Sequence, residues 1–423
     1  MNIEEVLAYR GKTESYLVHS LLPFWLERIK DVKNGGFITH FDEFGQDTGE
    51  DNKSLISQTR SIYTIASAHR AGYGDGKCSE MAKFGVEFLI DKLWDNKYGG
   101  FYWMVDRSGN VIKNDKVLYG QSFAIYCLSE YASISNDPVG LEYAEKTFDL
   151  IQEHCYEPQY GGYLEMFDRS WNLAGPGSGG GDRKTLDVHM HLMEAYTTLY
   201  ECSRKEIHKQ KLIEVIELLI NKILHPEHKT GIPQFTLDWK QAPQIKFDII
   251  WGWDRYSDGE QKSNPSDNTC YGHNAEFAWL LIHALQILKF DISGYQDLLV
   301  KIFDHTVDNG IDMEYGGVFV EGPHKGGVYD YEKEFWQQAE VLTGMLDAYI
   351  LTEDLKYWEA YKNVFDFVFE KGINHETGEW WPLLSRKGEP IWRHMGHAWK
   401  TNYHTVRSMI QSVIRLDNIK RMK

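Results

Sequence analysis

The sequence predicts an all-α fold, an (α/α)6 barrel of inner and outer helices joined by short β-hairpin turns. A glycine turn followed by aromatic or β-branched residues recurs six times, at intervals of about 60 residues, and this period indicates a repeat architecture. Two helical stretches lie between successive turns. The turns are at 34–37, 98–101, 160–163, 229–232, 315–318 and 376–379.

The helical stretches form six pairs, each with an apolar stripe of helical period. In chain order they are 57–69 with 79–93, 118–131 with 140–154, 184–201 with 210–223, 274–287 with 295–308, 331–351 with 355–369, and 403–414 with 3–30. Because the two ends of the chain each supply half of the last pair, we expect a closed ring and not an open solenoid. No linker interrupts the pattern, so residues 1–423 are expected to form one domain.

Composition and charge disfavour several classes of function and location. The net charge of −17 disfavours a nucleic-acid partner or an anionic membrane surface. The five cysteines are scattered without a C-x-x-C pair, which indicates reduced thiols. The N-terminus lacks an apolar leader and no uncharged run reaches the length of a membrane span, so we expect a cytoplasmic protein with no membrane association.

Unusual polar and aromatic residues cluster near the start of the first helix of each pair. Equivalent positions around a ring converge on one mouth of the barrel, so these side chains are expected to form a shared site. His273 and Glu276 are three residues apart, which places a carboxylate near an imidazole on one helix face. The candidates are Arg60, Tyr119, Asp187, His191, His273, Glu276, Trp336, Trp399 and His404.

Histidine-led acid/base chemistry fits these residues best. Metal binding is the first alternative, but the H-x-H at His189 and His191 sends the two rings to different helix faces, so no metal is expected. No G-x-G-x-x-G fingerprint after a predicted strand, no Walker loop and no G-x-S-x-G occurs, and no cofactor is expected. A glycoside hydrolase would rely on two carboxylates, whereas here imidazoles dominate and favour moving a proton beside a carbonyl. A sugar-binding protein without catalysis is the other competing class.

Two irregular segments lie close to the candidate residues. The fourth interval is about 20 residues longer than its neighbours, and the excess, 251–265, lies just before His273 and includes Trp251. Long aromatic insertions beside a site are more often functional than neutral. The glycine-rich segment 175–181 is either a plain connector or a lid over the barrel mouth.

Four motifs resemble the N-acylglucosamine 2-epimerase superfamily, in the branch of the cellobiose and mannose 2-epimerases. They are Gln58-Thr59-Arg60, His189–Tyr196, Tyr271–Trp279 and Trp399–His404. The resemblance spans nearly the whole chain. It implies reversible epimerisation of an aldose at C2 without metal or nicotinamide, with a sugar as the one small-molecule partner of a monomer or homodimer.

The resemblance also implies roles for individual residues. His273 and His404 would be the two acid/base catalysts, and Glu276 would support His273. Arg60 would stabilise a cis-enediolate, and His191 would assist ring opening. Substrate contacts would come from Tyr119, Asp187, Trp251, Trp336 and Trp399.

Two departures from the family pattern bear on the substrate. Asp187 stands where cellobiose epimerases typically carry Asn, and segment 251–265 looks longer than its counterpart in those enzymes. A loop there could fill the space of a second glucose, so we expect interconversion of D-mannose and D-glucose. Cellobiose 2-epimerisation at the reducing-end glucose, or an aldose–ketose isomerase acting on mannose, are the alternatives.

Overall fold

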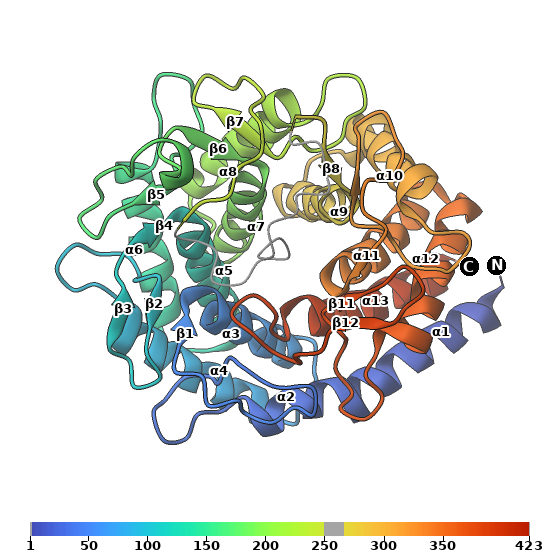
Figure 1. Cartoon of the computed structure of the whole chain (residues 1–423), viewed down its shortest axis with the longest axis horizontal. Helices are drawn as coiled ribbons and strands as arrows, with labels where there is room; N and C mark the ends of the chain where they lie inside the picture. The colour runs from blue at the N-terminus through green and yellow to red at the C-terminus, as the bar shows by residue number, and fades with distance from the viewer. Residues whose placement is uncertain (1, 249–265, 423) are drawn as a thin grey trace.

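The computed structural model describes residues 2–248 and 266–422, and in it six inner helices form a closed ring (Figure 1). Each inner helix packs against the next, and the last packs against the first, which closes the ring as the sequence predicts. The inner helices are α3 (Leu55–Arg70), α5 (Leu118–Ile134), α7 (Leu186–Ser203), α9 (Tyr271–Leu288), α11 (Phe335–Thr352) and α13 (Tyr403–Met422).

Six outer helical segments surround this ring, each packed on one inner helix. Four of them contain a π-helical turn. They are α1 (Ile3–Tyr16), η1 (Leu17–Leu21) and α2 (Leu22–Arg28) together, α4 (Lys77–Phe88) with η2 (Leu89–Leu93), α6 (Val139–His154), α8 (Glu206–Leu218) with η4 (Leu219–Ile223), α10 (Gln296–Gly310), and α12 (Leu355–Phe367) with η6 (Val368–Gly372). The (α/α)6 barrel is therefore confirmed. In the described part of the chain, no helix has the length and apolar character that a bilayer crossing needs.

Burial explains the composition of the two layers. Inner helices contact neighbours on several sides, so α9 is apolar along the run Phe277–Leu281, all of it buried. Outer helices bury one stripe: in α4, Met81 and Phe88 face the core while Lys83 and Glu87 form an exposed pair. Two predicted helix starts fall in strands: Lys184 belongs to a strand that ends before α7, and Lys333 and Glu334 form a strand that ends before α11.

Short antiparallel strands connect consecutive repeats. The strand before an inner helix pairs with the hairpin of the next repeat, as in Lys53 opposite Val105 and Lys333 opposite Leu384. The strands are β1 (Lys53–Ser54), β2 (Met104–Val105), β3 (Val111–Lys113), β4 (Lys116–Val117), β5 (Met166–Phe167), β6 (Arg183–Thr185), β7 (Gln234–Thr236), β8 (Thr269–Cys270), β9 (Glu321–Gly322), β10 (Lys333–Glu334), β11 (Leu383–Leu384) and β12 (Pro390–Trp392). Two 3-10 turns, η3 (Gly177–Gly179) and η5 (Ile292–Tyr295), complete the elements.

A polar side chain near the start of five inner helices binds the backbone of the preceding hairpin; we call it the clasp residue. Gln58 illustrates it, accepting from the Phe37 N–H at 2.8 Å and donating to the Phe37 carbonyl at 2.9 Å. A Cβ at Gly36 would lie 2.8 Å from the Gln58 amide oxygen, which explains one glycine of the motif. The clasp residues are Gln58, Gln121, His189, Asn274 and Gln338. In α13, Thr405 takes this place and reaches its hairpin through the Glu379 carboxylate.

Buried ion pairs anchor the same hairpins. In three repeats an aspartate binds both a buried lysine and an arginine from the next hairpin, as Asp95 does with Lys116 and Arg169. The other two such triads are Asp31–Lys53–Arg107 and Asp312–Lys333–Arg386. Paired charges of this kind compensate the cost of burying each member.

In the fourth repeat, two histidines and a threonine occupy the three positions of this triad. His225 stands in the place of the aspartate, Thr269 in that of the lysine and His324 in that of the arginine. The rings of His225 and His324 stack at 4.7 Å between centroids, and Thr230 hydrogen bonds Nδ1 of His324 at 2.8 Å. With His228 and His305 these residues form the fourth-repeat histidine cluster.

Candidate active site

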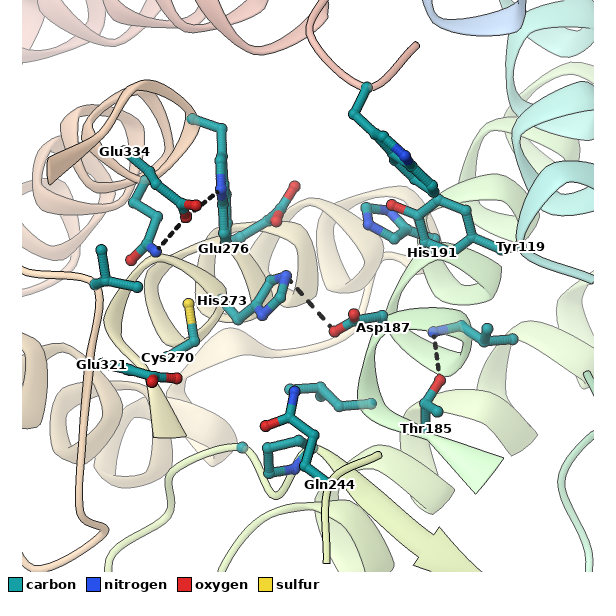
Figure 2. Close-up of a pocket in the computed structure, with 18 of the residues that line it drawn as sticks. Tyr119, Thr185, Asp187, His191, Gln244, Cys270, His273, Glu276, Glu321 and Glu334 are labelled. Carbon is teal, nitrogen blue, oxygen red and sulfur yellow. Dashed lines mark hydrogen bonds and ion pairs between the residues drawn. The ribbon is translucent and has the colours of Figure 1, made fainter. Parts of the chain in front are cut away.

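The N-terminal ends of the inner helices enclose a cavity of about 650 Å³. Every predicted site residue within the described chain lines it, so side chains from all six inner helices and from the segment before α13 meet in one place. Figure 2 labels five of them, Tyr119, Asp187, His191, His273 and Glu276. Trp251 and segment 251–265 lie outside the described residues. The glycine-rich segment 175–181 lies next to the cavity wall. Its Ser178 hydroxyl donates a hydrogen bond to the carboxylate of Asp248 at 2.8 Å.

The repeat places His273 and His404 at the same level of the ring. His273 directly precedes the clasp residue Asn274, and His404 directly precedes Thr405. Helix α11 lies between their helices in the ring, and its Trp336 contacts both imidazoles, at 4.6 Å from His273 and 5.7 Å from His404 between ring centroids. The two histidines therefore border the same part of the cavity from different repeats.

His404 is held by a carboxylate. Its Nδ1 lies 2.6 Å from Oε1 of Glu340, and both side chains are buried. Because an ionised carboxylate only accepts, Nδ1 carries the hydrogen and Nε2 has a free lone pair. Burial lowers the pKa of His404 to about 3, against the opposing effect of Glu340, so the ring is neutral at pH 7.

His273 pairs with Asp187 and not with Glu276. Its Nε2 lies 3.5 Å from Oδ1 of Asp187, as Figure 2 shows. Glu276 instead accepts from Arg407 Nη2 at 2.8 Å. Glu276, expected beside His273, lies nearly one helical turn further along α9, where the buried guanidinium of Arg407 binds it.

Arg60 sits between two aromatic residues of the cavity wall. It donates from Nη1 to the Trp399 carbonyl at 3.0 Å and from Nη2 to the Tyr119 hydroxyl at 2.9 Å. Among the described residues its buried Nε has no hydrogen-bond partner. A fixed cation with a spare donor suits an oxygen that gains negative charge.

A buried ionic network lies one turn deeper than the two catalytic candidates. Two residues beyond the clasp position stand Arg60, His191, Glu276, Glu340 and Arg407. His191 Nδ1 lies 2.9 Å from Glu194 Oε2, which again leaves Nε2 free. Arg407 donates to Glu194, Glu276 and Glu340. Burial would raise the pKa of Glu194, but Arg407, His191 and Tyr403 together lower it to about 2.

Three ligand-type side chains, Glu276, Glu340 and His404, converge with their donor atoms within 4.8 Å of one another. Arg407 already supplies a cation to both carboxylates. The set therefore fits a guanidinium and does not require a metal ion for charge balance.

The sequence reasoning missed several side chains of this site. Glu340 was not among the predicted residues, yet it stands two residues after Gln338 just as Glu276 stands two after Asn274. Glu334 accepts a hydrogen bond from the Trp336 indole at 2.8 Å. It lies just before α11, so the helical periodicity of the sequence did not indicate it. Glu165 and His397 also line the cavity. Burial raises the pKa of Glu165 to about 8 and lowers that of His397 well below 6.5.

The arrangement can move a proton on either side of a small molecule. Two imidazoles border one cavity, a guanidinium stands nearby, and indoles provide flat apolar faces. Aromatic faces pack against the C–H faces of sugars. This donor set matches proton abstraction next to a carbonyl and return of the proton from another direction.

Comparisons with known proteins agree with this chemistry. A cellobiose 2-epimerase of Bacteroides fragilis is 28% identical over 97% of this chain and 99% of its own length. The solved structure of a cellobiose 2-epimerase from Bacillus thermoamylovorans superposes with a TM-score of 0.85 at 26% identity, covering 96% of this chain and 99% of that one. A D-mannose isomerase of Marinomonas mediterranea is 24% identical over 88% of this chain and 89% of its own. The family model described as N-acylglucosamine 2-epimerase matches residues 36–408, and the chain belongs to this family of carbohydrate epimerases and isomerases.

Proposed function

We propose that the protein is a sugar 2-epimerase that inverts C2 of an open-chain aldose through a cis-enediolate, with the whole ring acting as one catalytic domain. The observation that carries this proposal is the placement of His273 and His404 at one level of the ring, with Trp336 in contact with both. Inversion at one carbon needs an acid and a base on opposite faces, and two imidazoles meet that need.

In the proposed reaction one imidazole removes the proton from C2, and the electron pair moves into a C1–C2 double bond. The negative charge that develops on the C1 oxygen is stabilised by Arg60. The other imidazole, in its protonated form, then returns a proton to the opposite face of C2 and the carbonyl re-forms. Each turnover leaves the sugar's composition unchanged and moves one proton off one histidine and onto the other.

His191 is the proposed acid/base for opening the pyranose ring. Its Nε2 lone pair is free because Nδ1 binds Glu194, and its ring contacts Tyr119 at 5.2 Å between centroids. Ring opening transfers a proton from the C1 hydroxyl and delivers one to the ring oxygen. A neutral imidazole beside a phenol can shuttle that proton.

The substrate supported best by the comparisons is the reducing-end glucose of a β-1,4 disaccharide such as cellobiose. Relatives from Bacteroides fragilis and Dictyoglomus turgidum, which match 97% and 95% of this chain, carry that activity in their names. A cavity of about 650 Å³ lies within the range of sites that enclose drug-sized ligands.

D-mannose is the second candidate. The extra length of the sequence between the fourth turn and α9 favours it, on the sequence expectation that an insertion before His273 takes up the space of a second sugar. Asp187 beside His273 also adds a carboxylate where a hydroxyl-rich monosaccharide would lie.

One experiment distinguishes the candidate sugars and separates a 2-epimerase from an isomerase, a hydrolase and a non-catalytic sugar-binding protein. Chelator-treated protein is incubated in D2O with cellobiose, D-mannose or N-acetylglucosamine, and products are resolved by chromatography and NMR. The proposal predicts the C2 epimer with deuterium at C2. A ketose as main product would indicate an isomerase, free glucose from cellobiose a hydrolase, and binding without exchange a non-catalytic protein.

A further inference from the structure

The Arg407 network contains more carboxylates than cations, and this imbalance has a chemical consequence. Glu194, Glu276 and Glu340 come from three inner helices and all hydrogen bond the one guanidinium of Arg407. None of the four side chains is more than 3% exposed. Three ionised carboxylates around one buried cation would leave excess charge without solvation, so the favourable state holds a proton on one of them.

The hydrogen bonds decide which carboxylate holds that proton. Glu194 accepts from His191, from the Tyr403 hydroxyl at 2.7 Å and from Arg407. Glu340 likewise accepts three donors, from His404, from the Trp279 indole at 2.9 Å and from Arg407.

Glu276 has the weakest support for a negative charge. Within the described chain, Arg407 is its one hydrogen-bond donor. A carboxylate with few donors keeps its proton longest.

We infer that Glu194, Glu276, Glu340 and Arg407 act as one ionic unit that holds a single shared proton, and that this proton resides on Glu276 and moves off it when either other carboxylate is neutralised. Glu276 is then a positioning residue, which sets the charge beneath the cavity. The unit keeps one ionised carboxylate behind His191 and one behind His404, so both imidazoles present a free Nε2 to the cavity.

The neighbouring elements add one further cation and three phenols to the surroundings of this unit. Arg60 adds positive charge on the cavity side, while the phenols of Tyr63, Tyr126 and Tyr403 are buried and neutral. Burial and the charge of Glu340 raise the pKa of Glu276 well above 4.5, although Arg407 opposes them, and the pKa of Glu340 falls to about 2 because Arg407 and His404 outweigh burial. The role of this ionic unit in catalysis rests on the proposed function, whereas the presence of a proton on Glu276 does not depend on it.

Infrared spectroscopy of the sugar-free protein at pH 7 tests the inference, because protonated and ionised carboxyl groups absorb at different frequencies. Glu276→Gln should remove one protonated-carboxyl band, since Gln replaces the neutral acid without changing the charge. Glu194→Gln should remove the same band without touching Glu276, because Glu276 then ionises. Glu340→Gln should do the same and serves as a second variant if Glu194→Gln does not fold.

Glu165 supplies the matched control. It is a buried carboxyl outside the Arg407 network, bonded to the Thr185 hydroxyl at 3.0 Å. Its own protonated band should persist in all three variants and vanish in Glu165→Gln. A Glu276→Gln spectrum that keeps every protonated band would overturn the location of the proton. Retention of the Glu276 band in both folded Glu194→Gln and Glu340→Gln would overturn the sharing. Both results are independent of activity on any sugar.

Discussion

The Nδ1 atom of His404 lies 2.6 Å from Oε1 of Glu340, with both side chains buried beneath the cavity. This contact fixes the tautomer of His404 and points its free Nε2 away from Glu340. Among the described residues, His273 has no such buried partner; its Nε2 faces the half-exposed carboxylate of Asp187 at 3.5 Å. The two candidate bases therefore share a level of the ring but differ in how their proton is controlled.

Replacing Glu340 with Gln should lower kcat by about 10²- to 10⁴-fold, the range that positioned acid/base groups contribute. The amide can donate to Nδ1 of His404 and so favours the wrong tautomer, while KM should change little. Steady-state kinetics on the preferred sugar measures this. Glu142→Gln, in an exposed pair with Lys146 on α6, is the control and should leave kcat unchanged. An unchanged kcat in Glu340→Gln would show that Glu340 does not control the tautomer of His404 in catalysis.

Replacing Trp336 with Ala should lower kcat and raise KM together, because the indole contacts both imidazoles and lines the cavity. Trp336→Phe should recover part of both, since a ring keeps the flat face but loses the hydrogen bond to Glu334. A comparison of kcat and KM for the two variants tests it. Equal loss in both variants would show that the hydrogen bond, and not the aromatic face, matters.

Replacing Arg60 with Gln should lower kcat by about 10²- to 10³-fold, the loss measured when one donor to a developing oxyanion is removed. Arg60→Lys should be intermediate, since it keeps the charge and loses the fork that binds Trp399 and Tyr119. Arg70→Gln on the same helix, whose partners are Glu130 and Glu201, is the control for charge loss alone. Activity of Arg60→Gln equal to that of the control would contradict the assigned role.

The free energy of unfolding should fall as pH drops from about 6.5 toward 4. Burial, with the neighbouring His225, lowers the pKa of His324 to about 4, so the unfolded chain binds its proton at a higher pH than the folded one. This contribution is complete above the unfolded pKa and is lost on acidification, by an amount on the order of 3 kcal/mol. Urea unfolding at a series of pH values measures it.

The other repeats provide the matched variant. Combining His225→Asp, Thr269→Lys and His324→Arg rebuilds the triad found at Asp95, Lys116 and Arg169. These charges do not change between pH 4 and 6.5 when paired, so the slope of stability against pH should flatten. His324→Gln alone should flatten it in part. The same slope in both variants as in the original chain would exclude the cluster as its source.

Much of the fold could be predicted because its signals are local and repeated. In four hairpins a glycine lies against a clasp residue such as Gln58, and the helix pairs carry apolar stripes, so the repeated copies reinforce one another. The start of α11 was harder. Lys333 and Glu334 have helical propensity, yet they pair with a hairpin about 50 residues later, a contact that no local pattern reports.

The sequence predicted which residues line the cavity better than it predicted which of their side chains contact one another. Histidines and aromatic residues near helix starts identified the cavity wall, because the ring brings equivalent positions together. The H-x-x-E spacing was a weaker guide. It forms a direct contact in His191 and Glu194, but the same spacing in His273 and Glu276 does not, because Arg407 on another helix binds the second carboxylate. Competition of this kind between distant segments is absent from a linear pattern.

The most direct test of the central claim is exchange of the C2 hydrogen by single histidine variants in D2O. If His273 and His404 act on opposite faces of C2, His273→Gln and His404→Gln should each lose epimerisation. Each folded variant should still exchange the C2 hydrogen of one epimer, and the epimer should differ between the two. Exchange of the same epimer by both variants, or undiminished epimerisation by either, would contradict the account.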